Sequence, residues 1–211
     1  IEAAGYHAVY IGQKTYNGVA IISPRPIDEA SVVRNIPGFE DEQKRLIAAT
    51  IDGVRVVCGY FPNGQAPGSE KFAYKMQWLQ ALQDWVRGEM QAHERLVLVG
   101  DFNVAPEDRD SYDPVGLADT IHHTKEERAH FQALLALGLA DAYRMFEQPE
   151  KSYSWWDYRM LGFQKNRGLR IDHILVSKAL QPAVRACQID RAPRKNPQPS
   201  DHAPVVVTLE N

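Results

Sequence analysis

The residues best placed to do chemistry are an acid and an amide that follow a short apolar run. Leu96–Val99 is aliphatic, Gly100 follows it, Asp101 and Asn103 come next, and Pro106 closes the segment. The run predicts a strand buried on both faces, and the two-residue spacing directs both polar side chains the same way. A carboxylate beside a carboxamide suits a phosphate, a hydrated metal ion or both. The simpler interpretation is an Asx turn that caps its own backbone.

Three further segments put polar side chains at the ends of predicted strands. An apolar strand leads to Tyr60, an otherwise apolar strand over residues 169–176 contains Asp172, and Asp201 and His202 directly precede the last strand. Strand ends of this kind that converge on one edge would form a hydrolytic or phosphoryl-transfer site. Taken singly, they are also compatible with a core tyrosine, a buried hydrogen-bond acceptor and a loop histidine.

The other potential metal ligands do not indicate a site. His173 alternates away from the acid that precedes it, and the segment with His122, His123 and His130 lacks a metal-ligand spacing. The two cysteines have no partners at ligand spacing, which disfavours zinc and a disulfide framework. Their setting fits a reducing compartment, and we expect the cytoplasm.

Composition indicates an ordinary globular protein. The chain has 211 residues, 44% of them hydrophobic and 24% charged, with a formal net charge of −3. No apolar run approaches the roughly 20 residues that span a bilayer, which excludes a membrane protein. The net charge argues against broad nonspecific binding of nucleic acid, although a local basic groove remains compatible with it. Basic residues gather in two places, which solvated loops would also explain. The first group is Arg159, Lys165, Arg167 and Arg170, and the second is Arg191, Arg194 and Lys195.

The periodicity predicts many short strands and two helices. Residues 70–93 carry apolar side chains at helical spacing, and Thr124 with Glu127 forms a capping box that starts a second helix. Strands are predicted over residues 7–11, 18–23, 46–51, 54–60, 96–106, 153–158, 169–176, 184–189 and 203–209. This order favours a layered α/β or α+β sandwich over a βαβ pattern.

Five segments together resemble the exonuclease III family of abasic (AP) endonucleases, within the endonuclease/exonuclease/phosphatase superfamily. They are Cys58–Gly64, Gly100–Val104, Ser154–Arg159, Asn166–Asp172 and Ser200–Pro204. The resemblance covers residues 1–211 as a single domain. It implies an α/β (α+β) four-layer sandwich, with two mixed β-sheets face to face and helices outside. It also implies a monomeric, Mg²⁺-dependent nuclease that cuts double-stranded DNA 5′ of abasic sites and at 3′ ends.

The resemblance also implies roles for individual residues. The catalytic set would be Tyr60, Asp101, Asn103, Asp172 and His202. Asp101 would orient or deprotonate the attacking water, and Asn103 would hold a phosphate oxygen. His202, with its tautomer fixed by Asp172, would stabilise the charge that develops on the phosphate. Tyr60 would either donate its hydroxyl to the phosphate or position the nucleophile.

Metal and substrate contacts follow from the same resemblance. The ligands of Mg²⁺, for which Mn²⁺ could substitute, would be Asp101, Asn103 and Asp201. The pocket for the base-less sugar would be lined by Trp155, Leu169 and Ile171. The backbone phosphates would be contacted by Asn63, Lys71 and Arg170.

The chain departs from the family pattern at its beginning. The resemblance implies N-terminal strands and a glutamate that is the principal metal ligand, and we expect this chain to start after them, inside the domain. We therefore expect weaker Mg²⁺ binding and weak or no activity from these 211 residues alone. Two other functions stay open: a superfamily phosphatase or phosphodiesterase that acts on a small phosphoester, and a noncatalytic DNA-binding remnant.

Overall fold

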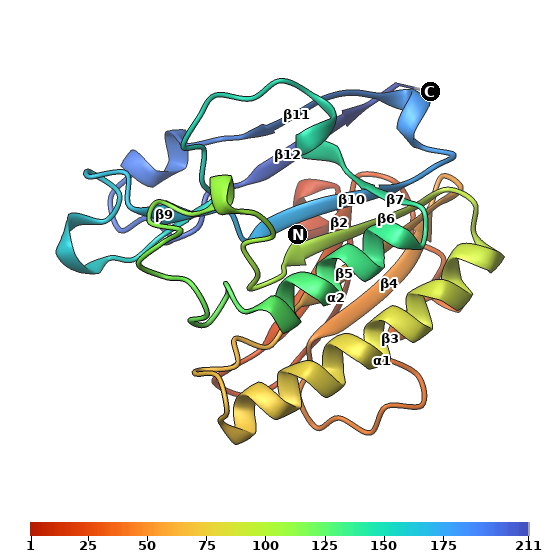
Figure 1. Cartoon of the computed structure of the whole chain (residues 1–211). Helices are drawn as coiled ribbons and strands as arrows, with labels where there is room; N and C mark the ends of the chain where they lie inside the picture. The colour runs from red at the N-terminus through yellow and green to blue at the C-terminus, as the bar shows by residue number, and fades with distance from the viewer. Residues whose placement is uncertain (211) are drawn as a thin grey trace.

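A six-stranded mixed sheet forms the centre of the molecule (Figure 1). The computed structural model describes residues 1–210. In sheet order the strands are β3 (Val33–Arg34), β4 (Leu46–Ile51), β5 (Val54–Tyr60), β6 (Leu96–Asp101), β10 (Asp172–Ser177) and β7 (Leu139–Asp141). β5 and β6 run parallel, whereas the other neighbouring pairs are antiparallel. The carboxyl ends of β5 and β6 therefore meet at one edge of the sheet, beside the start of β10.

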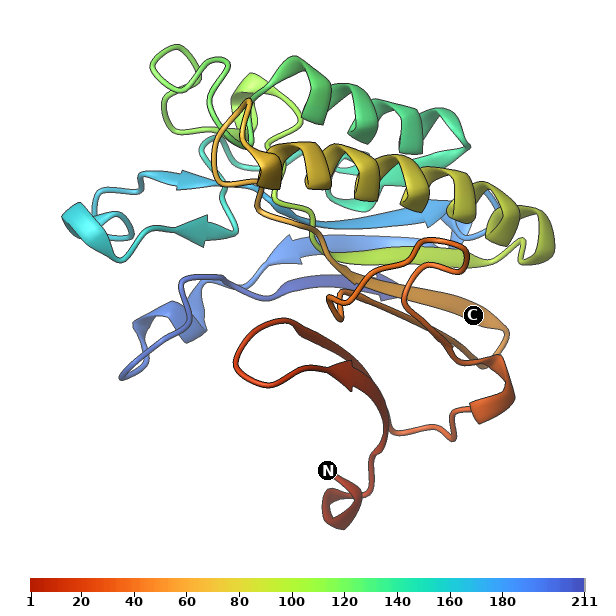
Figure 2. The same ribbon diagram turned by 90° about the horizontal axis from the view of Figure 1, so that it is seen from below.

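Two helices cover one face of this sheet (Figure 2). α1 (Glu70–Ala92) begins at Ser69, whose side chain accepts a hydrogen bond from the Phe72 N–H. α2 (Lys125–Ala136) begins at the predicted capping box. Both helices bury aromatic and aliphatic side chains against β5, β6 and β10, and burial of each such side chain contributes roughly 1.5–3 kcal/mol.

Two hairpins pack on the opposite face of the central sheet (Figure 2). The first consists of β1 (His7–Gly12) and β2 (Gly18–Ser23), and the second of β11 (Val184–Ile189) and β12 (Val205–Leu209). Within residues 1–210 no ladder hydrogen bonds join the two hairpins into one sheet. The structure therefore has a mixed central sheet, further antiparallel strand pairs and two α-helices, consistent with the predicted α/β class.

The remaining regular elements are short. A small two-stranded sheet pairs β8 (Trp155–Trp156) with β9 (Gly168–Leu169). The 3₁₀ helices are η1 (Glu2–Ala4), η2 (Glu29–Ser31), η3 (Asp108–Asp110), η4 (Ala142–Met145), η5 (Arg159–Leu161), η6 (Gln181–Ala183) and η7 (Ala192–Lys195). Neither long helix, and no other helix in the described part of the chain, is both long and apolar enough to cross a bilayer.

Most predicted elements are confirmed, and the exceptions lie beside the polar strand ends. The predicted strand over 169–176 is broken into β9 and β10, because the N–H groups of Ile171 and Asp172 both donate to Ser154 Oγ at 3.1 Å. The predicted strand over 153–158 shortens to two residues. The Ser154 side chain thus takes the place of strand-to-strand hydrogen bonds where the chain passes from the small sheet to the central sheet.

Candidate active site

Three of the predicted catalytic residues occupy one row of the central sheet. Tyr60 ends β5 and pairs with Asp101 at the end of β6, and Asp101 pairs with Asp172 at the start of β10. The sheet register therefore fixes both carboxylates at the same edge. Tyr60 is half-buried there, with the Arg45 guanidinium 4.8 Å from its ring centroid.

Only glycine fits directly before the first carboxylate. Gly100 has φ 141°, and a Cβ at this position would lie 1.8 Å from the carbonyl oxygen of Gly59 on β5. The chain then turns inward at Phe102, whose N–H donates to the Ile171 carbonyl at 2.8 Å. The Phe102 ring stacks on Phe61 with centroids 4.1 Å apart. A close backbone approach and a buried ring thus fix the end of β6.

Asn103 sits in a left-handed turn and bonds back to the carboxylate of Asp101. Its φ is 52°. Its N–H donates to Asp101 Oδ1 at 2.9 Å, and its side-chain Nδ2 donates to Asp101 Oδ2 at 3.0 Å. Asn63 in turn donates to Asn103 Oδ1 at 3.2 Å. The Asx turn of the simpler interpretation is therefore present, and it places the amide against the acid.

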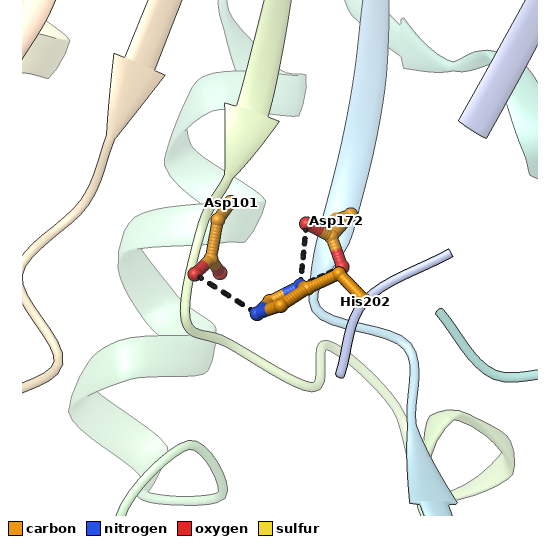
Figure 3. A group of neighbouring side chains, drawn as sticks. All are labelled: Asp101, Asp172 and His202. Atoms are coloured by element: carbon orange, nitrogen blue, oxygen red, sulfur yellow. Dashed lines mark hydrogen bonds and ion pairs between the residues drawn. The ribbon is translucent and has the colours of Figure 1, made fainter. Parts of the chain in front are cut away.

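His202 completes the group at the sheet edge (Figure 3). Its Nδ1 lies 2.9 Å from Asp172 Oδ2, and its Nε2 lies 3.9 Å from Asp101 Oδ2. Burial alone would lower the pKa of His202, but the hydrogen bond and charge of Asp172, with the nearby Asp101 and Asp201, raise that pKa to about 9. The imidazole is therefore a cation at neutral pH, held with Nε2 toward the first carboxylate.

The two carboxylates of this group are suited to hold a divalent cation, with the His202 imidazolium beside them. One ligand atom from each of Asp101, Asp172 and His202 lies within 4.8 Å of the other two. Burial, and then the charge of Asp172, raise the pKa of Asp101 to about 7. A cation beside this pair would favour ionisation of both acids, and their hard oxygens suit Mg²⁺ or Mn²⁺. The donor set thus fits a divalent ion.

The other two predicted metal ligands are engaged with protein groups. The Asn103 amide bonds Asp101, Asn63 and the Phe61 carbonyl. Asp201 Oδ2 accepts a hydrogen bond from Trp155 Nε1 at 3.0 Å, and its carboxylate is not part of the three-residue group. The structure therefore brings Asn103 to the site through Asp101 and does not bring Asp201 into the cation-binding group.

A buried ion pair supports Asn103 from below. Lys75 on α1 is 0% exposed and pairs with Glu127 on α2, and its Nζ donates to the carbonyls of Asn103 at 2.8 Å and Asn63 at 3.2 Å. His122 Nδ1 lies 2.7 Å from the Asn103 carbonyl and so carries the ring proton. Burial, and then the charge of Lys75, lower the pKa of His122 to about 4, which leaves it neutral.

Sequence reasoning missed these three supporting residues. Lys75 had a usable signal, because it falls at helical spacing with Phe72, Leu79 and Leu82 on the apolar face of the predicted helix. A lysine at such a position needs a buried partner. Glu127 was predicted only as part of a capping box, which it also forms. No local pattern distinguished His122.

A cavity of about 800 Å³ adjoins the site. Trp155 and Leu169 line it, as the resemblance implied, and so do Asn63 and His122. Ile171 does not line the cavity: it is buried in the interior, and its N–H and carbonyl bond Ser154 and Phe102. The cavity therefore has an aromatic and aliphatic wall beside the polar groups at the sheet edge.

Two of the predicted phosphate contacts lie elsewhere. Arg170 is 1% exposed, and its guanidinium pairs with Asp110 at 2.7 Å and Asp141 at 2.8 Å. The prediction of a phosphate contact at Arg170 is wrong, because both its charge and its hydrogen bonds are used inside the protein. Lys71 is exposed on the first turn of α1 and does not line the cavity. His173 is buried and points away from the site, as predicted.

Comparisons with known proteins show the family of the chain. The model of the endonuclease/exonuclease/phosphatase family matches residues 2–202. Exodeoxyribonuclease III of Haemophilus influenzae is 36% identical over 224 residues, which cover 97% of this chain and 80% of that protein.

Solved structures of nucleases and related enzymes are also similar to this chain. The 3′-5′ exonuclease NExo of Neisseria meningitidis shares 48% identity with a TM-score of 0.96, and the match covers 99% of this chain and 81% of NExo. An AP endonuclease from Archaeoglobus fulgidus shares 33% identity with a TM-score of 0.94, covering 100% of this chain and 81% of the other. A 3′ phosphatase, NExo from Neisseria, is described bound to a product DNA hairpin; it is 47% identical, with a TM-score of 0.96 and coverage of 99% and 81%.

Proposed function

The chain belongs to the exonuclease III and AP endonuclease family of the endonuclease/exonuclease/phosphatase superfamily, and we propose that it is a divalent-metal-dependent DNA repair hydrolase. It would cut phosphodiesters 5′ of abasic sites and at the 3′ ends of duplex DNA. The observation that carries the proposal is the group of Asp101, Asp172 and His202 at one sheet edge, with separations of 2.9 and 3.9 Å.

This geometry supports general-base hydrolysis. Asp101, with its pKa raised to about 7, is matched to accepting a proton from water near neutral pH. The cationic Nε2–H of His202 would donate to a phosphate oxygen and stabilise the charge of the transition state. Asp172 would hold the imidazole by Nδ1. A bound Mg²⁺ or Mn²⁺ would add electrostatic stabilisation of the phosphate charge.

The amides beside the acid hold its carboxylate in place. Both side-chain N–H groups of Asn103 already donate, to Asp101 and to the Phe61 carbonyl, so a phosphate oxygen would replace one of these acceptors. Asn103 and Asn63 are linked to each other and to Asp101, and Lys75 fixes their carbonyls. Tyr60 lies in the same sheet row, and its hydroxyl would donate to the phosphate or position the nucleophile. Preorganised donors of this kind account for a large share of phosphoryl-transfer catalysis.

The adjoining cavity supports recognition of an abasic or 3′-terminal sugar. Trp155 and Leu169 would contact its apolar face, while the scissile phosphate meets the sheet edge. Double-stranded DNA with an abasic site or a 3′ end is therefore the proposed partner of a monomeric enzyme. We place the protein in a reducing cytoplasm, since Cys58 and Cys187 are both free.

Two features of the resemblance stay part of the proposal. The two hairpins would belong to a second mixed sheet, in a four-layer sandwich with outer helices. Mg²⁺ would bind weakly to this chain, because Asp101 and Asp172 are two carboxylates where a tight site uses more charged oxygens. Weak binding predicts weak cleavage by these 211 residues.

A cleavage assay tests the function. The chain is incubated with duplex DNA that carries an abasic analogue, a 3′ recessed end or a 3′ phosphate, in Mg²⁺, Mn²⁺ or EDTA. We expect metal-dependent cleavage that His202→Gln reduces by about 100- to 1,000-fold, and that the exposed-histidine control His7→Gln leaves unchanged. Release of phosphate from inositol phosphates without DNA cleavage would establish the phosphatase alternative. Metal-independent DNA binding without cleavage would establish the noncatalytic one.

A further inference from the structure

We propose that Arg194 is a positioning residue for His202. The proposal rests on the proposed function, because it takes His202 as the group that contacts the phosphate. Arg194 belongs to the second basic group of the sequence, for which a solvated loop was the simpler interpretation. Arg194 is instead 6% exposed, whereas its neighbour Lys195 is exposed.

An aromatic box encloses the Arg194 guanidinium. Its Cζ lies 4.9 Å from the ring centroid of Phe163, 5.5 Å from Tyr158 and 5.8 Å from Trp156. Trp156 and Phe163 are themselves packed edge to face, with centroids 5.1 Å apart. The three rings belong to the segment 156–163, which begins at the last residue of β8. Cation–π attraction favours a guanidinium that lies within about 6 Å of such ring centroids.

The hydrogen bond of this guanidinium leaves the box and reaches the loop that carries His202. Arg194 Nη1 donates to the Ser200 carbonyl. The next donor in the same residue, Nε, has no hydrogen-bond partner among the described residues. Among the described residues, the side-chain hydrogen bond of this buried cation is therefore the one to the Ser200 carbonyl. Ser200 lies two residues before His202 in the chain.

Neighbouring contacts attach the same loop to the same segment. Tyr158 Oη donates to the Pro199 carbonyl at 2.7 Å, and the Trp156 N–H donates to the Asp201 carbonyl at 3.0 Å. The His202 N–H donates to Ser200 Oγ at 3.1 Å. Ser200 is therefore held by Arg194 on one side and orients the His202 backbone on the other. Loss of the Arg194 guanidinium therefore removes the charged hydrogen-bond donor among these contacts.

The consequence for catalysis is positional. His202 must keep Nδ1 on Asp172 and present Nε2 toward Asp101, and both contacts depend on where residues 200–202 lie. A displacement of about 1 Å at a reacting group costs as much as 100-fold in rate. Arg194 does not touch the site itself, so its removal should reduce kcat and leave substrate affinity unchanged.

Hydrogen exchange of the full chain tests the proposal without relying on activity. In Arg194→Met, amide exchange in residues 200–203 should accelerate by about tenfold or more, the effect of losing a charged hydrogen bond. Exchange in α1 should not change. Arg194→Lys keeps a cation in the box and should show an intermediate effect. Lys195→Met removes one charge from the same loop and should match the wild type. If Arg194→Met does not fold, Arg194→Lys carries the same comparison.

Kinetics of the same variants supply the second measurement. We expect kcat about 10- to 100-fold lower in Arg194→Met with KM within about threefold of wild type, partial recovery in Arg194→Lys and no change in Lys195→Met. Unchanged exchange at 200–203, or equal acceleration throughout the sheet, would overturn the positioning role. A wild-type chain that cleaves none of the DNA substrates at saturating Mg²⁺ or Mn²⁺ would refute the proposed function for these 211 residues, whereas the exchange result would still decide whether Arg194 holds the loop.

Discussion

The substitution Asp101→Asn should stabilise the metal-free protein at high pH and destabilise it at low pH. The Asp101 side chain is 16% exposed and lies beside Asp172, and its pKa is raised from 3.8 to about 7. Between these two values the folded state binds the extra proton, so stability falls as pH rises through that window. The shift corresponds to about 4 kcal/mol at pH 8.

Asparagine removes the buried charge but forfeits part of a hydrogen bond. The Asn103 amide and N–H both donate to Asp101, and loss of one acceptor costs about 1 kcal/mol. We therefore expect Asp101→Asn to be about 3 kcal/mol more stable than wild type at pH 8, or about 6–12 °C in Tm. At pH 4 the wild-type group is already neutral in the folded state, and the variant should be about 1 kcal/mol less stable.

Urea denaturation in EDTA at several pH values measures this difference. Asp84→Asn, which removes an exposed acid from α1, is the matched control and should show no such change of sign. Excess Mg²⁺ should stabilise the wild type more than Asp101→Asn, because the cation binds the ionised carboxylate. A stability difference that is the same at pH 4 and pH 8 would refute the burial argument for Asp101.

Three further outcomes are expected. Asp172→Asn should lower the pKa of His202 by about 1–2 units from about 9; an NMR titration of the ring that still centres near pH 9 would contradict this. Gly100→Ala should destabilise the protein by about 3 kcal/mol or more, because its methyl group meets a β5 carbonyl; urea denaturation measures the loss, and wild-type stability would count against it. Arg170→Met should cost about 3–5 kcal/mol by leaving Asp110 buried without that partner, and a cost below about 1 kcal/mol in the same assay would show that the pair is dispensable.

The elements were predictable from the sequence because their signals are local. The helix predicted over 70–93 ends at Ala92, and the capping box at Thr124 starts α2. The strands predicted over 18–23 and 46–51 have the observed bounds. Each of these elements is specified by side-chain spacing or by a cap within a few residues. The local sequence pattern was therefore sufficient to predict these helices and strands.

The surroundings of the site were not predictable in this way, because the partners are distant in the chain. Arg170 sits in an alternating segment and pairs with Asp110, which is 60 residues away. Lys75 pairs with Glu127 across 52 residues. A charged residue whose partner is supplied by another element has the same local sequence as one that is solvated. The burial of Arg194 in an aromatic box escaped prediction for the same reason.

At Asp101 and Asn103 the Asx turn and the candidate site are formed by the same two side chains. The Asx turn caps the end of β6 and holds Asn103 at a positive φ, which asparagine adopts more readily than most other residues with a side chain. The same turn returns the amide to the carboxylate, and Lys75 fixes its carbonyl from below. The turn therefore caps the strand and also brings the amide to the acid.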